Sequence, residues 1–188
     1  MAIPKMLILR GNSAGAGSYP DEQGKTPAWP IGALHVQAAT DYAKRLGYEG
    51  VVLDKPGQPQ SQHSPQAKAA LKAFHEDETV CAFYGFSGGG YNLKHILDYL
   101  ASNEPQSLRR IDRVVVIGAP NKYGGKKIYL PSNFNPTAKK KVKDWKDADW
   151  EVVFRNNPKP SQMPKGLPKN LDTHMFGPDV LLTGWPED

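Results

Sequence analysis

The chain has 188 residues, a formal net charge of +5, 39% hydrophobic residues and 23% charged residues. These values exclude an intrinsically disordered chain, and the length suits a single domain spanning 1–188. No apolar run approaches the roughly 20 residues that a membrane span requires. The single cysteine, Cys81, excludes an intrachain disulfide and a thiolate-rich metal site.

Strand and helix patterns alternate along the chain. In chain order, the residues predict a strand over 6–10, a helix over 31–46, a strand over 51–53, a helix over 65–76, a strand over 79–84, a helix over 88–101, and strands over 113–117 and 151–154. Ser64 and Pro65 are typical of an N-cap and the first helical position, and Gly47 is typical of a helix C-terminus. Short apolar strands that alternate with helices indicate the α/β class. We expect a three-layer sandwich with a mainly parallel five-stranded sheet in the order 2-1-3-4-5.

One sequence motif indicates a catalytic function. The third predicted strand runs directly into Gly85-Phe86-Ser87-Gly88-Gly89, and a helix follows. G-x-S-x-G between a strand and a helix is typical of a nucleophile turn, which strains the serine backbone and exposes its hydroxyl at the start of the helix. The Gly88 N–H faces the same place and can bind a developing oxyanion. Ser87 is therefore the candidate nucleophile.

In this motif and in its order of elements, the chain resembles the α/β-hydrolase superfamily, in particular small members without a lid, the cutinase-like esterases and the phage lysin B type esterases. The resemblance implies a minimal α/β-hydrolase fold. It also implies a second oxyanion donor from the loop after the first strand. The matching loop here is 11–17, and the N–H groups of Asn12 and Ser13 are the candidates.

The resemblance further implies a histidine base that follows the serine and the acid in the chain. His174 lies after the fifth predicted strand, where the family places its histidine. His95 is the other histidine after Ser87, but it falls eight residues into the following helix, so we expect it to point away from the turn.

The acid is where the sequence departs from the family pattern. No carboxylate directly follows the fourth or fifth strand, where Asn121 and Asn157 stand instead. An asparagine can orient an imidazole, but it stabilises the imidazolium less than a carboxylate does. We rank Asp172 first because it lies two residues before the histidine, then Asn157, then Asp179.

Two further segments bear on location and partners. The apolar stretch before Arg10 is too short for a secretion signal, which together with the lone cysteine favours the cytoplasm. Residues 139–143 are basic and Trp145 follows, but interleaved aspartates argue against nucleic-acid binding. We expect these residues to open a solvated helix.

The sequence thus predicts a serine hydrolase that cleaves a carboxylic ester or thioester through an acyl-enzyme. Its partner would be a small-molecule or polymeric ester, and it would need no cofactor and no metal. A peptidase or an acyltransferase would use the same groups. The alternative is a non-catalytic binding protein on a degenerate hydrolase scaffold, which the missing carboxylate favours.

Overall fold

A computed structural model describes residues 1–11, 31–119, 122–123, 126–127, 140–142, 150–163, 165 and 173–186. The helices are α1 (Ile31–Arg45), α2 (Pro65–Glu76), α3 (Gly88–Asn103) and α4 (Gly177–Thr183), with short 3-10 helices η1 (Pro105–Arg110), η2 (Pro160–Gln162) and η3 (Thr173–Phe176). The strands are β1 (Lys5–Leu9), β2 (Glu49–Val52), β3 (Val80–Phe86), β4 (Arg113–Ile117), β5 (Lys122–Tyr123), β6 (Lys126–Lys127), β7 (Lys140–Val142) and β8 (Trp150–Arg155).

The central sheet has the strand order β2-β1-β3-β4-β8-β7. Its first five strands are parallel, which confirms the predicted order 2-1-3-4-5. β7 adds an antiparallel edge strand, in which Lys140 pairs with Val152 and Val142 with Trp150. The expectation of a helix is therefore wrong at 140–142.

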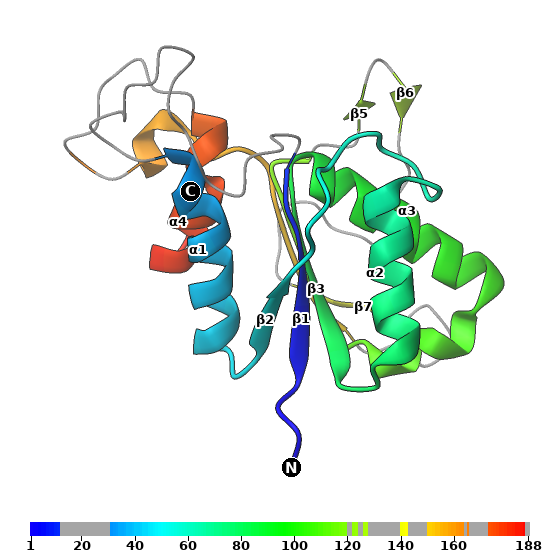
Figure 1. Cartoon of the computed structure of the whole chain (residues 1–188). Helices are drawn as coiled ribbons and strands as arrows, with labels where there is room; N and C mark the ends of the chain where they lie inside the picture. The colour runs from blue at the N-terminus through cyan, green and yellow to red at the C-terminus, as the bar shows by residue number, and fades with distance from the viewer. Residues whose placement is uncertain are drawn as a thin grey trace.

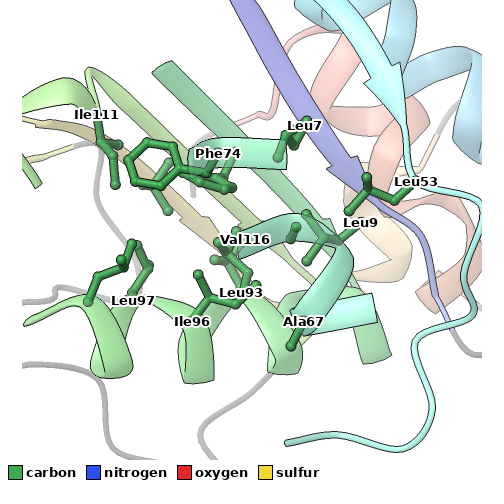
Figure 2. Close-up of a cluster of buried hydrophobic side chains, with 14 of the residues drawn as sticks. Leu7, Leu9, Leu53, Ala67, Phe74, Leu93, Ile96, Leu97, Ile111 and Val116 are labelled. Atoms are coloured by element: carbon green, nitrogen blue, oxygen red, sulfur yellow. The ribbon is translucent and has the colours of Figure 1, made fainter. Parts of the chain in front are cut away.

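Helices cover both faces of the sheet, with α1 and α4 on one side and α2 and α3 on the other (Figure 1). Because side chains alternate along a strand, Leu7 and Leu9 of β1 pack towards α2 and α3, while Met6 and Ile8 pack towards α1. Figure 2 shows the larger cluster, in which Phe74 of α2 lies among the β-strand side chains. This arrangement confirms the three-layer α/β sandwich.

Local signals explain the helix ends. The Ser64 hydroxyl accepts a 3.0 Å hydrogen bond from the Ala67 N–H, and Pro65 begins α2. Gly47, just beyond α1, has a φ of 87°, which a residue with a side chain rarely adopts. Within the described ranges, no helix has the length and apolarity needed to cross a membrane.

The parallel strands end at one edge of the sheet, and this edge carries the candidate site. Gly11 follows β1, Ser87 follows β3, Gly118 follows β4, and Asn157 lies two residues after β8. Parallel pairing brings the segments after these strands together.

Candidate active site

Ser87 lies in the sharp turn between β3 and α3. Its φ of 54° and ψ of −121° make it the one non-glycine residue with a positive φ in the described part of the chain. The Ser87 N–H donates to the Ile117 carbonyl at 2.9 Å, and the Ser87 carbonyl accepts from the Tyr91 N–H at 3.1 Å. These contacts hold the backbone in a conformation that costs on the order of 1–3 kcal/mol.

Close backbone contacts explain the glycines around the turn. A Cβ on Gly85 would lie 2.7 Å from the Gly89 carbonyl oxygen, and a Cβ on Gly89 would overlap the Leu9 carbonyl oxygen. The first turn of α3 therefore packs directly on the ends of β1 and β3. Gly11 lies beside the serine, because a Cβ built on it would be 3.3 Å from the Ser87 Cβ.

The Ser87 side chain is not used as a helix cap. A serine at an N-cap usually accepts a hydrogen bond from an N–H of the first helical turn. Ser87 makes no such bond, and its Oγ lies 2.9 Å from Nε2 of His174. The structure thus brings together the predicted serine and the predicted histidine, within the range for proton transfer.

His174 is held by two further contacts. Its ring stacks on Phe86, with the ring centroids 5.0 Å apart and an interplanar angle of 25°. Its Nδ1 lies 2.6 Å from Oδ1 of Asn157. An amide oxygen only accepts hydrogen bonds, so in the neutral imidazole this contact favours the tautomer with the proton on Nδ1, in which Nε2 accepts from the Ser87 hydroxyl.

The acid candidates differ in where they lie. Asn157, ranked second, faces Nδ1 of His174. Asp172, ranked first, lies outside the described residues. Asp179 lies on α4, and within the described structure its Oδ2 is buried without a hydrogen-bond partner. Burial raises the pKa of Asp179 to about 6. The two ring nitrogens of the histidine face Ser87 and Asn157, so Asp179 orients neither.

Residues 117–119, which are the last residue of β4 and the two that follow it, form a part of the site that was not predicted from the sequence. We call these residues the site turn, because they lie close to Ser87, His174 and Asn157. The Ile117 carbonyl holds the Ser87 N–H. A Cβ on Gly118, whose φ is 63°, would lie 2.9 Å from His174 Cε1 and 3.1 Å from Asn157 Oδ1. A glycine directly after a buried strand is the signal that could have indicated this close approach.

The register between β4 and β8 places the site turn beside Asn157. Ile117 pairs with Arg155 in these parallel strands, and the Gly118 N–H donates to the Arg155 carbonyl at 2.9 Å. Asn157 follows two residues later. The position of Asn157 beside His174 therefore follows from the strand pairing in the sheet. It does not follow from nearness in the sequence, because the two residues lie 17 positions apart.

The proposed oxyanion donors are described only in part. Gly88 is buried and is the first residue of α3, whose opening N–H groups have no partners within the helix. Asn12 and Ser13 lie outside the described residues. Gly11, which precedes them, lies beside Ser87 as described above.

The comparisons with known proteins identify no relative of this chain. No family model, curated protein or solved structure matches the chain. The ground for assigning a function is therefore the arrangement of Ser87, His174 and Asn157.

Proposed function

We propose that the protein is a serine hydrolase of the α/β-hydrolase type that cleaves a carboxylic ester or a thioester. One observation carries the proposal: Ser87 Oγ lies 2.9 Å from His174 Nε2, while His174 Nδ1 lies 2.6 Å from Asn157 Oδ1. A nucleophile on a strained turn, a base within hydrogen-bond reach and a group that orients the base are the parts that acyl transfer requires.

The proposed reaction proceeds through an acyl-enzyme. Ser87 Oγ attacks the carbonyl carbon of the substrate while Nε2 of His174 takes the hydroxyl proton. His174 then gives this proton to the leaving alcohol or thiol, the bond to the leaving group breaks, and the acyl group stays on Ser87. A water molecule attacks the acyl-enzyme with His174 again as the base, which releases the acid and restores the serine.

The oxyanion formed in each step needs hydrogen-bond donors. The Gly88 N–H is the first proposed donor because it follows the nucleophile at the start of α3, where the helix dipole favours negative charge. The N–H of Asn12 or Ser13 is the second proposed donor, and the position of Gly11 beside Ser87 supports a donor from that loop.

A second candidate function is binding without catalysis on the same scaffold. The amide that faces His174 favours it, since an amide stabilises the imidazolium less than a carboxylate does. The strained backbone of Ser87 favours the hydrolase, because strain at one serine is typical of a functional site.

Ester hydrolysis separates the two functions. We would measure release of para-nitrophenol from esters of increasing acyl length by the wild type, by Ser87→Ala, and by Ser102→Ala. Ser102 is an exposed serine near the end of α3 and serves as the matched control. We expect Ser87→Ala to lower kcat by roughly 10⁴-fold or more and Ser102→Ala to leave it unchanged. A folded wild type that is no faster than Ser87→Ala on every ester, thioesters included, would favour the binding protein.

A further inference from the structure

Lys94 is a fully buried lysine in the second turn of α3. It has a relative exposure of 0% and lies between the core residues Leu93 and Ile96. Its Nζ donates to the Ala119 carbonyl and lies 5.0 Å from the ring centroid of Phe154. It also lies 5.1 Å from the ring centroid of Tyr91. Removing an ammonium group from water is costly, and contacts of this kind offset part of that cost.

The carbonyl that Lys94 holds belongs to the site turn. Ala119 is the last residue of that turn. The Ile117 carbonyl accepts from the Ser87 N–H, and Gly118 lies close to His174 and Asn157. The turn also packs on α3, because a Cβ on Gly90 would lie 2.7 Å from the Ala119 Cβ. Lys94 and α3 thus both meet the turn at Ala119.

We propose that Lys94 is a positioning residue: by binding the Ala119 carbonyl, it holds the site turn against His174 and Asn157 and so keeps the imidazole within reach of Ser87. This inference rests on the proposed hydrolase function. Lys94 touches none of the reacting atoms and acts only through the turn.

The Lys94 ammonium group satisfies a buried carbonyl, because Ala119 is also fully buried. Holding an ammonium group at such a position has a high desolvation cost. Burial lowers the pKa of Lys94 to about 7, which reflects that cost. The amine and the ammonium can both donate to a carbonyl, so the contact with Ala119 persists through the titration.

The test compares two substitutions in the same helix. Lys94→Met removes the donor but keeps an unbranched side chain, and Leu97→Met changes a neighbouring side chain that is equally buried. Thermal unfolding gives stability, and a fluorophosphonate titration of Ser87 gives the active fraction. For Lys94→Met we expect lower stability than that of the wild type, because the buried Ala119 carbonyl loses this donor. We also expect kcat per labelled serine to fall roughly 10- to 100-fold with little change in KM. Leu97→Met should keep kcat.

A second readout does not depend on turnover. Long-range ¹⁵N–¹H spectra report the tautomer and the hydrogen bonds of the His174 ring, whose signals are assigned by their loss in His174→Ala. Lys94→Met should shift these signals or show two tautomers, and Leu97→Met should leave them unchanged. If Lys94→Met keeps both kcat and the His174 signals of the wild type, the proposal is overturned.

Two outcomes need separate interpretation. Should Lys94→Met fail to fold, Lys94→Leu replaces it, and failure of both to fold would overturn the proposal by making Lys94 a residue required for folding. Should the wild type itself neither label nor hydrolyse esters, the proposed function fails, and the His174 spectra still decide whether Lys94 positions the ring.

Discussion

The Nδ1 atom of His174 lies 2.6 Å from Oδ1 of Asn157, so the imidazole is oriented by an amide and not by a carboxylate. The amide selects the tautomer that a base needs, but it supplies no negative charge to the imidazolium that forms during proton transfer. In the proposed hydrolase, we expect the amide in place of a carboxylate to affect both kcat and the pH dependence of kcat/KM.

Changing Asn157 tests the orienting role. Asn157→Asp should raise kcat and move the acidic limb of the pH profile of kcat/KM to higher pH, because a carboxylate favours the protonated imidazole. Asn157→Ala should lower kcat by roughly 10²- to 10⁴-fold because the tautomer is no longer selected. Initial rates on an activated ester between pH 4 and 9 measure both effects.

The neighbouring Asn156 provides the matched control, since it is also exposed and one residue away. Asn156→Asp should leave the pH profile where it is in the wild type. Superimposable profiles for Asn157→Asp and Asn156→Asp would contradict an orienting role for Asn157.

A side chain at Gly118 should lower activity for two reasons: the positive φ of this residue and its closeness to His174. An added Cβ would lie 2.9 Å from His174 Cε1, so Gly118→Ala should displace the ring and lower kcat as well as stability. Gly184 also has a positive φ, of 106°, but has no atom within 4 Å of such a Cβ. Gly184→Ala should therefore cost about 1–2 kcal/mol of stability and leave kcat unchanged. Urea unfolding and initial rates measure the two quantities, and equal kcat values for both variants would contradict the close approach.

Asp179 should make stability depend on pH. Burial raises its pKa from 3.8 to about 6, so between these pH values the folded chain holds a proton that the unfolded chain has lost. The contribution of Asp179 to the free energy of unfolding therefore decreases as the pH rises from about 4 to about 6. Asp179→Asn removes the group, and its Tm relative to the wild type should increase across this window and stay higher at pH 7.

The control for this comparison is Asp98→Asn, which changes an exposed carboxylate on α3. Its Tm difference from the wild type should vary much less between pH 4 and 7. An Asp179→Asn difference that is equally flat would show that Asp179 titrates normally in the folded chain.

Local patterns were sufficient to predict the sheet and the sharp turn at Ser87. The apolar run of β4, the cap formed by Ser64 and Pro65, and the glycines beside Ser87 each depend on neighbours in the chain. The predicted histidine follows from the resemblance to a family and from its place after the last parallel strand. The edge strand β7 was not predicted, because three residues carry too little periodicity to distinguish an edge strand from the start of a helix.

The position of Asn157 in the site depends on the register between β4 and β8, which no local sequence pattern predicts. Asp172 was ranked above Asn157 because it is near His174 in the chain, but Asn157 reaches the ring through the pairing of Ile117 with Arg155. Lys94 was not identified because its contact with Ala119 joins residues that lie 25 positions apart in the sequence.

Covalent labelling of Ser87 tests the central claim most directly. We would treat the folded wild type, Ser87→Ala and His174→Ala with a fluorophosphonate at neutral pH and map the adduct by mass spectrometry. The proposed mechanism predicts one adduct on Ser87 in the wild type, none at that position in Ser87→Ala, and much slower labelling in His174→Ala. A folded wild type that carries no adduct on Ser87, or that labels no faster than His174→Ala, would contradict it.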